Sequence, residues 1–106
     1  ERMVRTTVQQ TKPERHAEIC AELNDVYRRK NADYGDSFGE TFRKLGVISA
    51  VTRITDKVNR LQSLCIRTAQ VHDESVRDTL LDLANYAIMS VIELERSKST
   101  ETEETK

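Results

Sequence analysis

Tryptophan is absent from this chain of 106 residues, and aromatic residues of any kind make up only 5% of it. One proline and three glycines are too few for a protein built from many strands and tight turns. No apolar run is long enough to span a membrane, and no signal peptide is visible. These absences predict a small, single-domain, all-α protein of the cytoplasm.

Charged residues make up 33% of the chain, but they nearly cancel and leave a net charge of -1. Because the chain has no global positive field, we do not expect it to bind duplex nucleic acid. A single copy of so short a chain would have a thin core, so we expect a homo-oligomer, a dimer or larger. The two cysteines, Cys20 and Cys65, fall on apolar faces of helical patterns. We therefore expect both to be reduced core residues without a disulfide.

Helix-start signals mark the first half of the chain. Residues 1–10 are predicted to form an N-terminal arm, for which a short strand, an arm that clasps a dimer and a disordered segment all stay open. A capping box of Thr11 and Glu14 opens the first helix. A second capping box, beginning at Ser37, predicts a short helix that ends near Gly46.

Apolar residues at steps of three and four predict two long helices, over about 47–71 and 73–98, that form an antiparallel hairpin. Residues 11–98 are thus expected to form one helical domain, followed by a disordered acidic tail at 99–106. The predicted fold is a small all-α bundle that contains this hairpin and is completed by homo-oligomerisation.

The last helix carries two stripes of opposite character. The first consists of oxygen ligands at spacings of four, four and three: Glu74, Asp78, Asp82 and Asn85. The second, which we expect to face the core, consists of Val76, Leu80, Leu83, Ala87, Val91 and Leu94. Carboxylates four residues apart repel one another by roughly a few tenths of a kcal/mol per pair. A solvated surface tolerates that repulsion, and Mg²⁺ or a cationic side chain offsets it.

The helix over 47–71 has a polar stripe of its own, made of Ser49, Arg53, Asp56, Arg60, Ser63 and Arg67. Lys57 lies nearer the apolar edge, where its stem can pack while its ammonium emerges. Two interpretations stay open: the polar stripes are solvated or paired with each other as ordinary ion pairs, or they bind a ligand. Asn85, a poor helix former, and the bulky Tyr86 and Met89 beside the acidic stripe favour a ligand.

The segment from Lys30 to Phe38 is a candidate ligand-contact loop. It gathers polar and aromatic side chains around Gly35, namely Lys30, Asp33, Tyr34, Asp36 and Ser37. A helix C-cap followed by a capping box would explain the glycine but not the tyrosine or the first aspartate. The two histidines, His16 and His72, are expected to pack or to cap a helix rather than to bind a ligand.

Three segments together resemble a known family: K-N-A-D-Y-G-D-S-F, R-I-T-D-K-V-N-R-L and D-E-S-V-R-D-T-L-L-D-L-A-N-Y-A-I-M. The resemblance covers about residues 25–95 and is to the phage and prophage family called nucleotide modification associated domain, first type. It implies a protein that acts on or binds nucleotides during viral DNA modification or conflict with the host. In that setting the protein would lie in the host cell cytoplasm.

A weaker resemblance is to the all-α nucleoside triphosphate pyrophosphatases, the MazG and dimeric dUTPase group. Those enzymes place an ExxE pair on one helix and an ExxD pair on the next, and the four carboxylates bind Mg²⁺. Here Glu74 and Asp78 correspond to the second pair, with one extra residue between them. Asp56 and Asn59 stand where the first pair would be, with cations alongside. This arrangement suits gripping phosphate better than holding several metal ions.

The sequence thus predicts a site for a phosphorylated nucleotide between the two long helices and the 30–38 loop, closed by a second subunit. The predicted nucleotide-binding residues are Lys30, Asp33, Tyr34, Arg53, Lys57, Arg60, Asp82, Asn85 and Tyr86. If the nucleotide is hydrolysed, Asp56, Glu74 and Asp78 are expected to hold Mg²⁺. Three functions stay open: a binder that sequesters a host signalling nucleotide, a Mg²⁺-dependent pyrophosphatase, and a structural or protein-interaction module.

Overall fold

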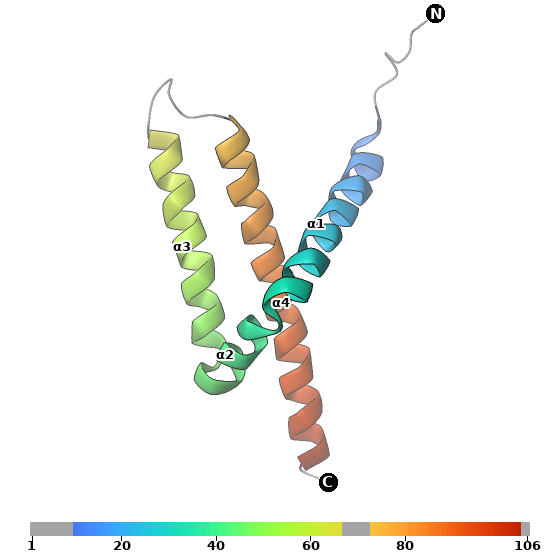
Figure 1. Ribbon diagram of the computed structural model, residues 1–106, viewed down its shortest axis with the longest axis vertical. Coiled ribbons are helices and arrows are strands. Elements are labelled where there is room, and N and C mark those ends of the chain that lie inside the picture. The colour runs from blue at the N-terminus through green and yellow to red at the C-terminus, as the bar shows by residue number, and fades with distance from the viewer. Residues whose placement is uncertain (1–9, 67–72, 105–106) are drawn as a thin grey trace, which may run out of the picture. The chain divides into compact units, whose positions relative to one another are not determined.

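The computed structural model describes the backbone at residues 10–66 and 73–104, and the side chains at residues 10–66 and 75–98. Within these ranges the chain forms four helices, which are α1 (Lys12–Tyr34), α2 (Ser37–Leu45), α3 (Val47–Ile66) and α4 (Asp73–Glu104). The predicted all-α class is therefore confirmed (Figure 1). The chain divides into two units, Glu1–Asp33 and Tyr34–Lys106, and each is described by itself.

The first unit contains most of α1, which begins with the predicted capping box. The Thr11 N–H donates to Glu14 Oε1 at 2.9 Å, and the Glu14 N–H donates to Thr11 Oγ1 at 3.2 Å. One turn further on, hydrogen bonds from Arg15 and Gln10 lower the pKa of the exposed Glu18 carboxyl. The capping box thus satisfies two backbone N–H groups at the start of the helix, those of Thr11 and Glu14, with side chains.

Helix α1 is longer than predicted, because it continues to Tyr34. Lys30, Asp33 and Tyr34 therefore lie on its last turns and not in a loop. The helix stops only at Gly35, whose φ of 72° lies in the left-handed region that glycine adopts readily. The polar residues Asn31 and Asp33 do not end the helix, because both can adopt helical backbone angles.

The expectation that both cysteines are core residues is wrong. Cys20 and Cys65 are both exposed free thiols. His16 is also exposed, and its Nδ1 lies 3.7 Å from the Cys20 sulfur one turn away.

Helix α2 is capped one residue earlier than the sequence predicted. Asp36, not Ser37, is the N-cap, and its Oδ1 accepts a hydrogen bond from the Gly39 N–H at 3.3 Å. The Asp36 carboxylate also lies 3.6 Å from Arg43 Nη1 of the same helix. At the other end Gly46, with φ 81°, donates its N–H to the Phe42 carbonyl at 2.7 Å, so the predicted end is confirmed.

Helices α3 and α4 lie side by side and antiparallel (Figure 1). Lys57 contacts Asp82 and Arg60 contacts Thr79. Residue numbers along the contact therefore rise on α3 while they fall on α4, as in an antiparallel pair. Helix α3 is described to Ile66, and the rest of its predicted span lies outside the described residues. Helix α4 continues to Glu104, beyond the predicted end near Lys98.

The line along which α3 and α4 meet is called the seam here. On α3 its buried and half-buried residues recur at steps of four and three, as Ala50, Ile54, Lys57, Leu61 and Leu64. On α4 it contains Thr79, Asp82, Tyr86, Ser90 and Glu93. The rings of Phe38 and Phe42 extend the packing onto α2, with the Phe38 centroid 5.8 Å from that of Tyr86.

The apolar spine predicted for the core of α4 does not lie in the seam. Leu80, Val91 and Leu94 are each about half exposed, at 49%, 52% and 49%. Each of these residues directly follows a seam residue, so it points about 100° away around the helix. The expectation that this spine faces the core of the single chain is therefore wrong for the four exposed members, Leu80, Ala87, Val91 and Leu94, while Val76 and Leu83 are half-buried. None of the helices in the described ranges is both long enough and apolar enough to cross a membrane.

The observed cap gives a first prediction. Replacing Asp36 by alanine removes the acceptor for the Gly39 N–H, so the free energy of unfolding should fall by about 0.5–2 kcal/mol. The matched change Ser37→Ala should cost less than about 0.5 kcal/mol, because Ser37 is exposed and is not the cap. Urea unfolding of the two variants measures this difference. Equal losses, or a larger loss for Ser37→Ala, would contradict the assignment of the cap.

Candidate functional site

Lys57 is the central residue of the candidate site. Its Nζ lies 3.1 Å from Asp82 Oδ2 and 5.9 Å from the centre of the Tyr86 ring. The Lys57 side chain is 26% exposed and that of Asp82 is 37% exposed, so the pair lies at the edge of the seam. Partial burial and two neighbours on α4 restrict where this ammonium can move. Only one of its three N–H donors is needed for the bond to Asp82.

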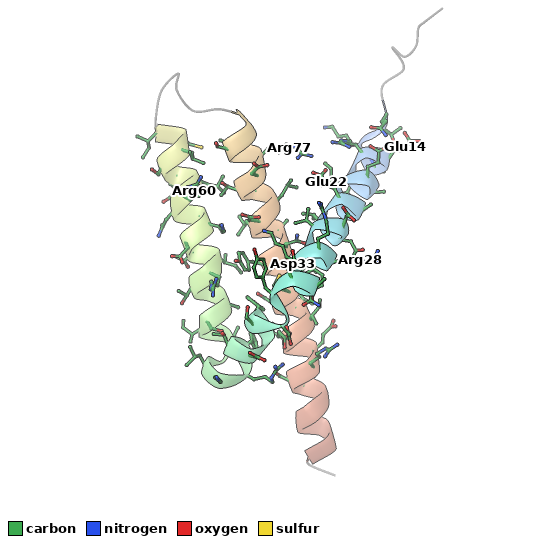
Figure 2. The ribbon with its side chains drawn as sticks, viewed as in Figure 1. Glu14, Glu22, Arg28, Asp33, Arg60 and Arg77 are labelled. Atoms are coloured by element: carbon green, nitrogen blue, oxygen red, sulfur yellow. The ribbon has the colours of Figure 1, made fainter. Side chains whose placement is uncertain are left out.

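Arg60 lies one turn further along α3, and α4 holds its guanidinium near the seam (Figure 2). Its Nε donates to Thr79 Oγ1 at 3.3 Å, and the Thr79 hydroxyl donates in turn to the Ser75 carbonyl at 2.8 Å. Thr79 is only 3% exposed. A buried hydroxyl that donates to its own helix and accepts from Arg60 therefore positions a cation at the surface.

Tyr86 is held by contacts on two helices. Lys57 of α3 lies near its ring, and the Phe38 ring of α2 packs against it at an interplanar angle of 34°. The Phe38 and Phe42 centroids are 6.5 Å apart, which continues the cluster along α2. Tyr86 is thus a half-buried, fixed aromatic ring at the site.

One side of the hairpin is polar. Its residues each directly precede a seam residue and consist of Arg53, Asp56, Arg60, Asp78 and Asn85. All of them are exposed except Asn85, which is half-buried and has interactions of its own. This set, called the polar side here, contains part of each stripe that the sequence predicted, because Asp82 of the acidic stripe lies in the seam and the side chain of Glu74 lies outside the described residues. The two stripes lie next to each other, as the antiparallel hairpin requires.

The predicted metal ligands divide between described and undescribed side chains. Asp56 of α3 and Asp78 of α4 are exposed on the polar side. The side chain of Glu74 lies outside the described residues. Among the side chains at 10–66 and 75–98, no three His, Cys, Asp or Glu residues gather closely enough to hold a metal ion. The Mg²⁺ site therefore stays a prediction that needs Glu74.

The three site residues predicted on the 30–38 loop lie on α1. Lys30 and Asp33 belong to the first unit, and Tyr34 begins the second. Tyr34 is 76% exposed at the end of the helix. That these three side chains join those of α3 and α4 around one ligand stays a prediction.

Sequence reasoning missed a second polar cluster and two supporting residues. Arg43 of α2 lies 3.6 Å from Asp36 and 3.9 Å from Glu93 of α4, whose side chain is 11% exposed. This cluster ties α2 to the hairpin. Thr79 and Phe38, which position Arg60 and Tyr86, were also missed. The sequence shows that both residues lie in helical segments, but it does not show which face of each helix packs against another helix.

The family model described as nucleotide modification associated domain 1 matches residues 30–94, which is more than half of the chain. The chain therefore belongs to this family, and the match includes every described site residue from Lys30 to Glu93. Neither the curated proteins nor the solved structures gave a match. The weaker resemblance to the MazG-like pyrophosphatases is accordingly not shown.

The ion pair at the centre of the site yields a second prediction. In a double-mutant cycle with Lys57→Met and Asp82→Asn, we expect a coupling of about 0.5–1 kcal/mol, because the pair is half-buried. The exposed pair of Arg29 and Asp25 on α1 is the control, with about 0.3–0.5 kcal/mol expected. Chemical unfolding of the single and double variants supplies these values. Strict additivity at Lys57 and Asp82 would show that their contact contributes nothing to the seam.

Proposed function

We propose that this member of the nucleotide modification associated domain 1 family binds a small phosphorylated nucleotide on the polar side of the α3–α4 hairpin. The observation that carries the proposal is the pair of cations Lys57 and Arg60, one helical turn apart and each held by a residue of α4. The family description supports a ligand of this class. Two cations at one place favour an anion with more than one charge, such as a phosphate or diphosphate.

The two cations suit different parts of a phosphate group. Arg60 keeps further N–H donors after its Nε bonds Thr79, and a guanidinium binds two phosphate oxygens at once. Lys57 supplies a compact charge that is already restricted by Asp82 and Tyr86. Arg53, exposed on the same side of α3, adds a third cation. Because Asp82 already neutralises part of the Lys57 charge, the phosphate is expected to rely most on Arg60.

The remaining polar groups would read the nucleoside. Asp82 accepts hydrogen bonds from hydroxyl groups such as those of ribose, and Asn85 both donates and accepts, as recognition of a base edge requires. The fixed ring of Tyr86 offers a surface for stacking. That Lys30, Asp33 and Tyr34 also bind the ligand stays a prediction from the sequence. Selectivity would come from these groups, because phosphate contacts are common to all nucleotides.

Whether the ligand is hydrolysed depends on Mg²⁺. Asp56 and Asp78 would bind the ion together with Glu74, and Mg²⁺ would polarise the phosphates and orient water. Asn59, which stands beside Asp56, is an amide and carries no negative charge. For that reason sequestration of an intact nucleotide, such as a host signalling nucleotide, is the leading proposal. A Mg²⁺-dependent pyrophosphatase is the alternative.

A panel of nucleotides tests the proposal directly. The chain is incubated with each nucleotide, with Mg²⁺ or with chelator, and the bound and released molecules are separated by chromatography. Recovery of an intact nucleotide with the protein supports sequestration, and release of a shortened nucleotide together with pyrophosphate supports the enzyme. If no member of the panel is retained or converted, the nucleotide proposal fails and the structural interpretation replaces it.

The phosphate contacts give a third prediction. Replacing Arg60 by glutamine should weaken binding of the retained nucleotide by on the order of 1.5–3 kcal/mol, roughly 10- to 150-fold. Lys57→Gln should act in the same direction, and both effects should shrink as salt rises. Calorimetric titration measures the affinity. Lys44→Gln removes one exposed positive charge from α2 and is the matched control, for which the affinity should stay within about twofold. Equal losses for all three variants would indicate a general charge effect and no specific site.

The metal proposal gives a fourth prediction. Asp78 is exposed, so Asp78→Ala should change the free energy of unfolding by about 0.5 kcal/mol or less. If Asp78 helps to hold Mg²⁺, the variant should lose the difference in affinity or turnover that Mg²⁺ makes for the wild-type chain. Titrations with Mg²⁺ and with chelator, alongside circular dichroism, measure both properties. A variant that keeps the full Mg²⁺ effect removes Asp78 from the metal site, and one that unfolds shows that Asp78 is structural.

A further inference from the structure

The hairpin has an uncovered apolar surface opposite its polar side. It is formed by Val47, Val51 and Val58 of α3 and by Leu80, Ala87, Val91 and Leu94 of α4. All seven residues are exposed, from 36% at Val58 to 52% at Val91 among the larger side chains. This set is called the apolar face here. An exposed apolar surface that spans two helices marks an interaction site more often than chance scatter.

The two halves of the apolar face lie on the same side of the hairpin. Most of its residues directly follow a seam residue, as Val58 follows Lys57 and Leu80 follows Thr79. Residues of the polar side instead directly precede a seam residue. Antiparallel helices of the same hand turn toward the same side of their common contact. One step forward along either helix therefore leads to the apolar face, and one step back leads to the polar side.

A layer of two helices with one apolar face needs a second layer to cover it. Among the described residues, none of the large side chains is fully buried, so packing within the chain leaves its apolar surface largely unburied. The question is what supplies the second layer. A second copy, a different protein and the chain's own α1 are the possible occupants.

The spacing on α4 fits a second copy. Leu80 and Leu94 each lie seven residues from Ala87, so the apolar residues are arranged symmetrically about it. Lys57 lies opposite Asp82 in the hairpin, and Arg60 lies opposite Thr79. Continuing this antiparallel pairing along the hairpin puts Ala87 of α4 at the same height as Thr52 of α3. Thr52 lies midway along the α3 part of the face, between Val47 and Val58. Both stripes thus share one centre, as a two-fold interface requires.

The charges beside the apolar face also fit a second copy, and they favour an antiparallel over a parallel arrangement of the two α4 helices. Arg77 and Glu95 lie on the same flank of the α4 stripe, near opposite ends of it. In an antiparallel pair of α4 helices centred on Ala87, Arg77 lies near Glu95 of the partner subunit, and the reverse contact occurs by symmetry. A parallel pair would place arginine beside arginine and glutamate beside glutamate. Small residues at the centre, Ala84 and Ala87, allow close approach of the two helices.

We propose that the apolar face binds the same face of a second copy of this chain, with α4 antiparallel to α4 about a two-fold axis at Ala87. Leu80 then packs against Leu94 of the partner subunit, and Val58 lies near Val47 of the partner subunit. Two hairpins form a four-helix arrangement in this way, with a polar side on each outer surface. The proposal does not depend on nucleotide binding.

Cysteine cross-linking on the full-length chain tests the interface. The exposed native thiols are first removed as Cys20→Ser and Cys65→Ser. In that background, Ala87→Cys places two thiols at the two-fold axis, and mild oxidation should convert most of the protein to a covalent dimer. Ser63→Cys is the matched control, because Ser63 is an exposed α3 residue away from the apolar face. It should remain largely uncross-linked under the same conditions.

Light scattering of the unmodified chain completes the test. We expect twice the chain mass of 12.2 kDa at micromolar concentration. The variant Ala87→Glu should run at the single-chain mass while its circular dichroism stays helical, because it places two like charges at the axis. A wild-type monomer at this concentration would overturn the proposal. A dimer that cross-links through residue 63 and not through residue 87 would also overturn it, even where Ala87→Glu fails to fold.

Discussion

The seam between α3 and α4 determines the character of both sides of the hairpin, and its chemistry is unusual for a helix contact. On α4 it buries hydroxyls, and Thr79 and Ser90 each donate to a carbonyl one turn back, at 2.8 and 2.7 Å. A hydroxyl satisfied by its own helix can be buried without a partner on the facing helix. These small side chains and Ala50 of α3 are all buried where the two helices meet. On α4 the aliphatic residues Leu80, Val91 and Leu94 therefore lie to one side of the seam, whereas α3 places Ile54, Leu61 and Leu64 in it.

The position of the seam places the polar side and the apolar face on opposite surfaces of the hairpin. The residues one step back from the seam include Arg53 and Arg60 on α3 and Asp78 and Asn85 on α4. The residues one step forward include Val51 and Val58 on α3 and Leu80, Val91 and Leu94 on α4. The seam also connects these surfaces to the aromatic cluster, because Tyr86 contacts Phe38 on one side and lies near Lys57 on the other. A site of this kind is fixed by packing below it, while its charged groups stay within reach of solvent.

Much of the fold could be predicted from the sequence because its signals are local. The Thr11 capping box, the end of α2 at Gly46 and the two stripes of the last helix need only neighbouring residues. Other features depend on competition or on tertiary contact. Asp36 and Ser37 are both good caps, and the cap residue chosen also pairs with Arg43. Which face of α4 meets α3 was not predictable, because the burial of Thr79 and Ser90 depends on hydroxyl bonds to their own helix that the sequence does not show.

The candidate site shows the same division. Periodicity placed Arg60, Asp82 and Asn85 on one side of the hairpin. The ion pair of Lys57 with Asp82 agrees with the interpretation that the stripes pair with each other, and it leaves the ligand-binding interpretation open. An ion pair at the edge of a seam contributes little to stability, since its charges remain largely hydrated. The pair does hold the Lys57 ammonium in one place, but the Asp82 carboxylate partly neutralises the positive field that a ligand would meet there. A nucleotide phosphate bound as proposed would therefore have to share Lys57 with Asp82. Arg60, whose Nε donates to the neutral Thr79 hydroxyl, would then be the stronger determinant of phosphate affinity.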